Sequence, residues 1–156
     1  MLSGEERAAA ALAASGIKHS IVHHGPVTSL EEAADARGLR PHQVLKTIVV
    51  RRSDDDYLFV LVPGDRQISW PKLRHLLDVK RLSLPDAATA LAVTGYERGT
   101  ITPFGSLHEW PVIADTTIRG TVSIGGGGHG VSATVNAKSL VKVLRAQTSD
   151  VTDPRS

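Results

Sequence analysis

The sequence predicts an α+β fold, a single domain in which a mixed, curved β-sheet is flanked by short helices. Runs of β-branched and aromatic residues alternate irregularly with short helical segments, so the regular βαβ repeat of doubly wound nucleotide-binding folds is missing. The clearest pair of strands is joined by a short charged turn, which is typical of an antiparallel hairpin. At 156 residues and 16.6 kDa the chain has the size of one domain, and no linker divides it.

The first 40 residues are expected to form a helix, a strand and a second helix. Residues 4–15 (GEERAAAALAAS) make the first helix, which Gly16 ends because glycine readily adopts the left-handed C-cap conformation. Residues 17–23 alternate enough for a short strand. The second helix begins at a Thr-Ser capping region at 28–29 and is closed by Gly38.

The middle of the chain is expected to hold the hairpin and two further helices. Its strands are LKTIVVR at 45–51 and YLFVLV at 57–62, and the charged SDDD segment between them is the turn. A helix at 69–77 begins at a serine cap. The next helix, at 85–93, begins with proline at its first position and stops before Gly95.

The last third is expected to be mostly strand. Strands are predicted at about 111–117, 120–124 and 131–136, followed by a helix at 137–145 (AKSLVKVLR). The polar residues 148–156 are expected to fray as a C-terminal tail, so the predicted domain covers residues 1–147.

The composition limits the possible functions. The formal net charge is only +2, whereas proteins that wrap nucleic acid over a large surface are usually far more basic. The absence of cysteine excludes thiolate nucleophiles, cysteine-based zinc sites and iron–sulfur clusters. Without a signal-like N-terminus or a run of about 18 apolar residues, we expect a cytoplasmic protein with no membrane association. The best basic cluster, either a solvated helix face or a phosphate contact, consists of Lys72, Arg74, Lys80 and Arg81.

The segment Gly95–Gly105, GYERGTITPFG, is the most distinctive stretch of the chain. Its three glycines and its proline order the backbone, and loops ordered in this way often line a site. A Gly/Pro-rich connection can also simply turn a corner. Within the segment, we expect Tyr96 and Phe104 to pack the loop rather than to contact a substrate.

A second glycine-rich segment, GGGGHG at residues 125–130, directly follows the strand VSI. Successive glycines at the end of a strand can turn their N–H groups toward one anion or developing oxyanion, although a flexible hairpin tip is the alternative. Neither the Walker A sequence nor a Rossmann context is present. His129 favours a ligand site, because an imidazole on a bare loop is well placed to meet a ligand.

Lys46 and a group of histidines are the remaining candidates. Lysine is uncommon in strands, and an edge-strand lysine that blocks aggregation is one interpretation of Lys46. The apolar residues that follow it favour a central strand, whose lysine would point into a cleft. No metal-binding motif is present, so we expect no metal site among the histidines His19, His23, His24 and His42.

Taken in order, Lys46-Thr47, VLVPGD at 60–65, the 95–105 loop, Asp115 and the SIGGGG turn resemble one family. This is the YbaK / prolyl-tRNA synthetase-associated domain family of aminoacyl-tRNA deacylases, and the resemblance covers roughly residues 17–145. It implies a barrel-like mixed sheet flanked by helices, hydrolysis in trans of the ester of misacylated tRNA, and no metal cofactor. The implied partner is the acceptor end of aminoacyl-tRNA, often tRNA for proline; a synthetase partner and the oligomeric state are left open.

The resemblance also assigns roles to individual residues. Lys46 would hold the terminal adenosine or its phosphate, and the Gly99 N–H, in a GxxxP element ending at Pro103, would lie beside the scissile carbonyl. The positions implied to bind substrate are Thr47, Pro103, Asp115, Ser123, Gly125 and Gly126. The Lys-Thr pair is typical of cysteine-type members and His129 of alanine-type members, so the amino acid removed stays open among alanine, cysteine and serine.

The expected chemistry needs no protein nucleophile, because an aminoacyl ester is already activated and positioning plus oxyanion stabilisation suffice. The backbone N–H groups of Gly99 and of residues 125–128 are the expected oxyanion donors, and His129 is the group suited to carry a proton. Two other classes stay open: a non-catalytic module that binds an aminoacyl or nucleotide end beside a synthetase, and a metal-independent hydrolase of another ester.

Overall fold

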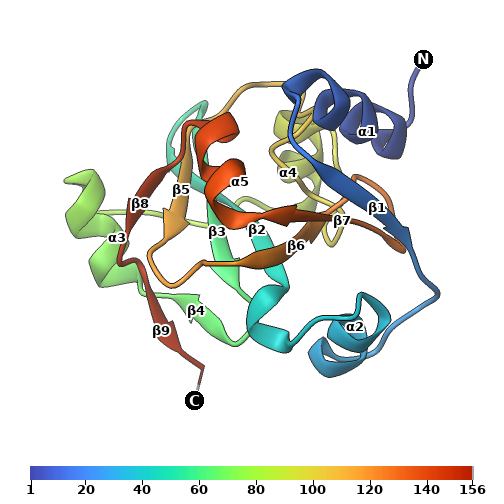
Figure 1. Ribbon diagram of the computed structural model, residues 1–156. Coiled ribbons are helices and arrows are strands. Elements are labelled where there is room, and N and C mark those ends of the chain that lie inside the picture. The colour runs from blue at the N-terminus through green and yellow to red at the C-terminus, as the bar shows by residue number, and fades with distance from the viewer. Residues whose placement is uncertain (156) are drawn as a thin grey trace.

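The computed structural model describes residues 1–155, whose strands form three sheets, none of them closed (Figure 1). The helices are α1 (Gly4–Ser15), α2 (Leu30–Ala36), the 3₁₀ turn η1 (Pro41–Gln43), α3 (Trp70–Leu77), α4 (Ala87–Thr94) and α5 (Ala137–Leu144). The strands are β1 (His19–His23), β2 (Leu45–Ser53), β3 (Asp56–Pro63), β4 (Arg66–Ile68), β5 (Val112–Asp115), β6 (Thr121–Gly125), β7 (Val131–Asn136), β8 (Gln147–Ser149) and β9 (Thr152–Pro154).

The predicted α+β class with a mixed sheet is confirmed. The largest sheet has the order β2-β3-β5-β8, in which β2 and β3 are antiparallel and the other two pairings are parallel. A second, antiparallel sheet has the order β1-β7-β6, and β4 pairs with β9 in the third. A parallel bridge between Val44 and Ser123 joins the second sheet to the start of β2, so the glycine run after β6 lies near the edge of β2.

Local signals in the sequence account for most element boundaries. Helix α1 has the predicted bounds, because Ser3 and Glu6 form a capping box at its start and Gly16 caps its end at φ 77°. The predicted hairpin is confirmed, and Asp55 in its tight turn takes a positive φ of 56°. Helix α4 begins later than expected: Asp86 is its N-cap, so the preceding proline lies outside the helix.

The expectation of a frayed C-terminal tail is wrong for the described residues, because two short strands form there. Strand β8 adds to the parallel edge of the large sheet, and β9 pairs with β4. Between them Val151 is fully buried in an apolar cluster. One buried valine and two long-range strand pairings therefore order a segment whose composition is polar.

The core consists of two apolar clusters on opposite faces of the β2–β3 hairpin. One cluster contains Leu45, Val49 and Phe59 and extends to α1, β6 and β7; the other contains Val50 and Val60 and extends to α3 and Val151. Because both faces are covered, β2 is apolar along much of its length. The prediction that it is central is nevertheless wrong, since β2 is the edge strand of its sheet.

The helices lie around these sheets (Figure 1). Helices α1 and α2 lie on the side of β1, whereas α3 lies on the opposite side near β8. No helix within residues 1–155 combines the length and the apolar character that a membrane crossing requires.

Candidate functional site

The 95–105 loop is closed on itself by its own aromatic residues. The Tyr96 hydroxyl donates a hydrogen bond of 2.6 Å to the Phe104 carbonyl oxygen, and both rings are buried. The expectation that these two residues pack the loop is confirmed. Beyond the loop, the Trp110 indole donates a bond of 2.8 Å to the Val93 carbonyl oxygen, which ties the segment before β5 to the end of α4.

A residue that sequence reasoning missed holds both ends of this loop. From α1, Arg7 donates through Nη2 to the Gly95 carbonyl oxygen at 2.7 Å and through Nε to the Gly105 carbonyl oxygen at 3.4 Å. Its guanidinium carbon also lies 4.9 Å from the centre of the Tyr96 ring, a cation–π contact. Nothing local distinguishes Arg7 from any other charged residue of a first helical turn, so the sequence carried no signal for this role.

The glycine run after β6 packs against the same loop. The Gly127 N–H donates to the Thr100 carbonyl oxygen at 3.1 Å, and the Gly126 N–H donates to the Val131 carbonyl oxygen at 3.0 Å. A Cβ on Gly125 would lie 2.8 Å from the Ile101 carbonyl oxygen. The prediction that Gly126 and Gly127 offer free N–H groups to an oxyanion is therefore wrong, because internal hydrogen bonds use both. The glycines are needed for close packing.

Gly99 lies exposed at the junction of two cavities, with φ at 87°. The first, called the Thr47 cavity, has a volume of about 310 Å³, and its lining includes Thr47, Ile48, Val49, Pro85, Gly99 and one charged residue, Arg98. The second, called the His24 cavity, has a volume of about 450 Å³ and is lined by His24, Val27, Arg37, Gly99, Gly128 and His129. Within residues 1–155 the Gly99 and Gly128 N–H groups donate to no internal acceptor, so both are free to donate to a ligand.

The open edge of β2 supplies polar backbone groups to the Thr47 cavity. Arg51 exchanges backbone hydrogen bonds with Ser83 on the side away from β3. In an antiparallel strand every second residue turns its N–H and C=O to the same side, so Val49 and Thr47 present theirs to the cavity. The Thr47 hydroxyl is also buried without a hydrogen-bond partner. These groups can bind the amine or amide of a ligand.

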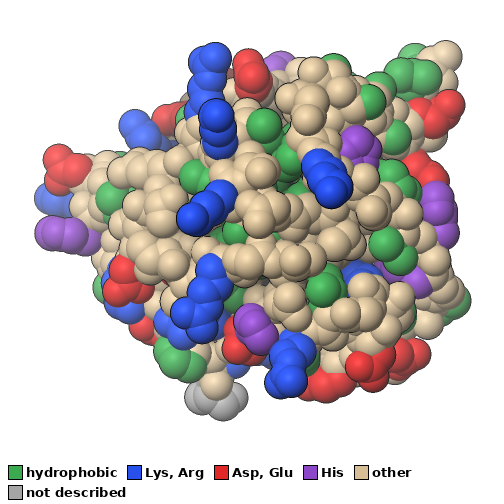
Figure 2. Space-filling view, in the orientation of Figure 1, with side chains coloured by type: hydrophobic (Ala, Val, Ile, Leu, Met, Phe, Trp, Pro, Cys, Tyr) green, Lys and Arg blue, Asp and Glu red, His purple; other side chains and the backbone are tan. Residues whose placement is uncertain are grey.

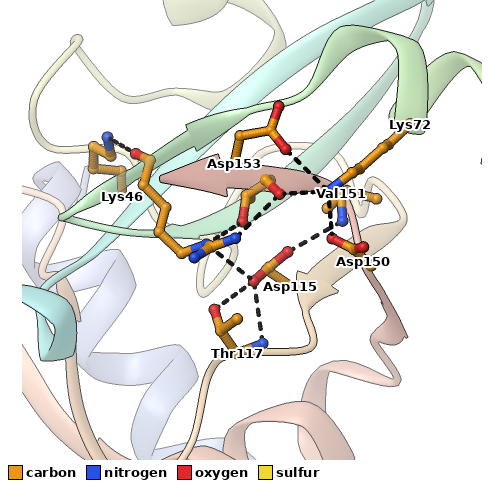
Figure 3. A network of polar contacts seen from close by, with 9 residues as sticks. Lys46, Lys72, Asp115, Thr117, Asp150, Val151 and Asp153 are labelled. Carbon is orange, nitrogen blue, oxygen red and sulfur yellow. Dashed lines mark hydrogen bonds and ion pairs between the residues drawn. The ribbon is translucent and has the colours of Figure 1, made fainter. Parts of the chain in front are cut away.

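The structure places Lys46 outside the lining of both cavities. Its Nζ donates to the Arg66 carbonyl oxygen at 2.9 Å (Figure 3). Partial burial lowers the pKa of the Lys46 amine, and the charge of Arg155 lowers it further while Asp65 opposes the shift. A contact between Lys46 and a substrate stays a prediction.

Asp115 is the buried centre of the polar network in Figure 3. Its carboxylate accepts bonds from the Thr117 N–H and the Val151 N–H, each at 3.1 Å, and from the Thr117 hydroxyl. Burial raises the pKa of this carboxyl, but hydrogen bonds from Thr117, Val151 and Thr152 outweigh it and hold the pKa below its ordinary value. These internal bonds give Asp115 a structural task, and a substrate contact there stays a prediction.

The other predicted site residues lie at different distances from the Gly99 junction. His129 is exposed on the rim of the His24 cavity, with Nε2 3.1 Å from a carboxylate oxygen of Glu97. Ser123 is fully buried at the bridge to Val44, with its hydroxyl unpaired, and Pro103 is half-buried within the loop. The structure thus places Thr47 and His129 in the linings of the two cavities that Gly99 joins; Ser123 and Pro103 line neither cavity.

The predicted basic cluster divides in two. Lys72 forms ion pairs with Asp150 at 3.1 Å and Asp153 at 3.0 Å. The other three line a separate cavity of about 630 Å³, which contains Arg51, Arg52, Arg74, Lys80 and Arg81. On the face shown in Figure 2, Lys and Arg side chains lie at several separate places, some of them beside Asp or Glu side chains. Within residues 1–155 no three His, Asp or Glu side chains are grouped as metal ligands require, and His23 pairs with Glu5 at 2.8 Å.

Comparison with known proteins adds to this geometry. A family model described as the aminoacyl-tRNA editing domain matches residues 24–143. The proline–tRNA ligase of Bacillus licheniformis is 26% identical over 108 residues, which cover 69% of this chain and 19% of the ligase. That of Desulforamulus reducens is 34% identical over 93 residues, 60% of this chain and 16% of the ligase. This chain thus spans less than a fifth of each ligase's length.

A solved structure of a proposed trans-editing enzyme for prolyl tRNA synthetase shares the fold, with a TM-score of 0.88. It is 23% identical to this chain and covers 98% of it and 99% of its own length. The matched family region begins after α1, so the helix that carries Arg7 lies outside it.

Proposed function

Because this chain belongs to the aminoacyl-tRNA editing domain family, we propose that it hydrolyses the ester of misacylated tRNA in trans. The proposed substrate is tRNA for proline that carries alanine, cysteine or serine, and the proposed place of action is the cytoplasm, where aminoacyl-tRNA is used. The observation that carries the proposal is Gly99, whose exposed left-handed backbone presents a free N–H where two cavities meet.

In the proposed reaction a water molecule attacks the ester carbonyl carbon at Gly99. The carbonyl oxygen becomes an oxyanion and accepts a hydrogen bond from the Gly99 N–H. One such donor stabilises the transition state by about 2.7–4 kcal/mol, which is roughly 10²–10³ in rate. The bond from the carbonyl carbon to the ribose oxygen then breaks. That oxygen takes up the proton that the water gives up, and free amino acid and tRNA are released.

His129 is the proposed carrier of that proton. Its ring lies beside Gly99, since a Cβ on Gly99 would be 4.0 Å from the ring carbon Cε1. The carboxylate of Glu97, 3.1 Å from Nε2, orients the ring. A histidine held by a carboxylate is a common arrangement for moving a proton near neutral pH.

The Thr47 cavity is the proposed place of the aminoacyl group. At about 310 Å³ it lies at the small end of ligand cavities, and its walls are mostly apolar. The open carbonyl groups of Thr47 and Val49 would accept hydrogen bonds from the α-ammonium group of the amino acid. One methylene in such a pocket is worth only about 1–3 kcal/mol, so the exclusion of proline must come from a clash with its ring.

In the proposed complex, Lys46 would give up its hydrogen bond to the Arg66 carbonyl oxygen and hold the terminal adenosine.

The experiment that tests the proposed function is a deacylation time course on tRNA charged with alanine, serine, cysteine, threonine or proline. Wild-type protein should release at least one of the small amino acids and spare proline. Lys46→Ala should slow that release, whereas Lys138→Ala, which removes an exposed lysine of α5, should not. Binding of the charged tRNA without any loss of ester would instead identify a non-catalytic module.

A further inference from the structure

Arg37 is a cation without a counter-charge. It caps the C-terminal end of α2 and lines the His24 cavity, and within residues 1–155 it forms no ion pair. Its Nε is buried and has no hydrogen-bond partner. Burial lowers the pKa of this guanidinium, with no acidic neighbour to oppose the shift. The residue as a whole is half-buried, so its guanidinium is partly removed from water without a partner that compensates.

His24, in the same cavity, also has an unused polar atom. Its Nδ1 lies 3.1 Å from the Gly25 carbonyl oxygen, which can only accept, so Nδ1 carries the hydrogen and donates the hydrogen bond, while Nε2 is buried without a partner. The backbone fixes the residue, because the His24 N–H donates to the Gly130 carbonyl oxygen at 2.8 Å. In the neutral ring Nε2 is an acceptor, and only a proton taken up there would turn it into a second donor.

The polar groups of the His24 cavity together favour the binding of an anion. The cavity offers a guanidinium, an imidazole that can take up a proton, and the free N–H of Gly128. Its walls include apolar side chains of Val27 and Val131, which lower the local dielectric and strengthen any charge-assisted hydrogen bond. The acidic residue at the rim, Glu97, is engaged with His129. Arginine is well suited to a phosphate because its planar fork donates two parallel bonds.

We propose that the His24 cavity is a phosphate subsite, in which Arg37 and His24 hold the phosphate group of the terminal nucleotide of the substrate RNA. Naming the nucleotide rests on the proposed function; the anion site does not. Gly99 forms a wall of this cavity and of the Thr47 cavity. An ester held at Gly99 with its aminoacyl group in the Thr47 cavity extends its ribose and 5′-phosphate toward Arg37.

The test compares the binding of AMP, adenosine and inorganic phosphate to the full-length protein by calorimetry, with the His24 ring signals followed by NMR. Wild-type protein should bind AMP about 10-fold or more tightly than adenosine, the effect of losing one charge-assisted contact. AMP, but not adenosine, should shift the His24 signals. Arg37→Gln and His24→Asn should each bring the two affinities close together.

The matched control is Arg81→Gln, which removes a cation that lines the separate basic cavity. It should leave the preference for AMP unchanged. Equal affinities for AMP and adenosine in the wild type, or an equal loss of preference in Arg81→Gln, would overturn the subsite. Inorganic phosphate that binds as tightly as AMP would overturn its assignment to a nucleotide. Thermal melting checks folding, and Arg37→Lys, which keeps the charge but loses the fork, provides a second variant at this position.

The subsite and the proposed function fail in different ways. With a misacylated tRNA that the wild-type protein cleaves, Arg37→Gln should raise KM about 10-fold or more and change kcat less. The reason is that the phosphate is remote from the bond that breaks. A protein that prefers AMP through Arg37 but cleaves no aminoacyl-tRNA would keep the subsite and lose the proposed function. Ester cleavage whose KM does not respond to Arg37→Gln would keep the function and reject the subsite.

Discussion

Replacing Gly125 by alanine should impair deacylation through the loop it supports. Gly125 has no positive φ, so alanine fits its backbone conformation. The new Cβ would nevertheless lie 2.8 Å from the Ile101 carbonyl oxygen and 3.4 Å from that of Thr100. The contact becomes ordinary only when the loop retreats by about 0.6 Å from the position in which it presents Gly99.

The magnitude follows from that displacement. Overpacking of this kind costs about 1–3 kcal/mol of unfolding free energy. A misplacement of about 1 Å can reduce a catalysed rate about 10²-fold, so a shift of roughly half that size should reduce kcat about 10-fold. Urea unfolding measures the first quantity, and single-turnover deacylation with saturating protein measures the second.

The matched control is Gly120→Ala. Gly120 has φ at 70°, and a Cβ there would meet nothing within 4 Å, so alanine adds backbone strain of about 1–2 kcal/mol without touching the loop. Its rate should equal that of the wild type. If Gly125→Ala lowered stability as Gly120→Ala does and kept full activity, the reasoning that close packing at Gly125 positions Gly99 would be refuted.

Two further predictions concern residues outside the cavities. Asp115→Asn should cost about 1–3 kcal/mol of unfolding free energy at pH 7, because it weakens the carboxylate contacts with Thr117 and Val151. The pKa of Asp115 is held below its ordinary value, so this stability is present above about pH 4 and is lost as the pH falls through the folded-state pKa. Urea unfolding from pH 7 to 2 should therefore show a weaker acid dependence for the variant than for the wild type; equal slopes would contradict the assignment. Arg7→Ala should free both ends of the 95–105 loop, reduce stability by about 1.5–3 kcal/mol and slow deacylation, with faster amide hydrogen exchange confined to the loop. Unchanged exchange in the loop would show that Arg7 does not hold it.

Much of the fold could be predicted because the signals for it are local. The capping box at Ser3, the left-handed glycine after α1 and the two apolar runs of the hairpin each specify an element within a few residues. Strands β4, β8 and β9 are three residues long and largely polar. Their pairing depends on partners far away in the chain and on the burial of Val151, so no local pattern predicts them.

The candidate site was predictable in its residue types more than in its arrangement. The sequence shows that the 125–130 segment is rich in glycine, but hydrogen bonds of the folded chain decide which N–H groups are free. The side to which Lys46 turns depends on the strands that flank β2. Arg7 and Arg37 reach the loop and the His24 cavity only through tertiary packing, and their sequence contexts gave no sign of it. From the sequence, His24 was named only as one of four histidines considered for a metal site.

The central claim is that the N–H of Gly99 acts on the ester, and a pair of alanine variants tests it most directly. Gly99→Ala and Gly120→Ala place the same methyl group at similar positive φ, and neither Cβ would meet an atom closer than 4.0 Å. Their costs in stability should therefore be alike. Alanine keeps the Gly99 N–H, but its methyl group would stand at the junction of the two cavities and hold the ester carbonyl away from that N–H. Single-turnover deacylation of the most rapidly cleaved misacylated tRNA should therefore fall about 10²-fold or more for Gly99→Ala, the effect of losing one oxyanion donor, and stay at the wild-type rate for Gly120→Ala. Equal rates for the two variants would contradict the account.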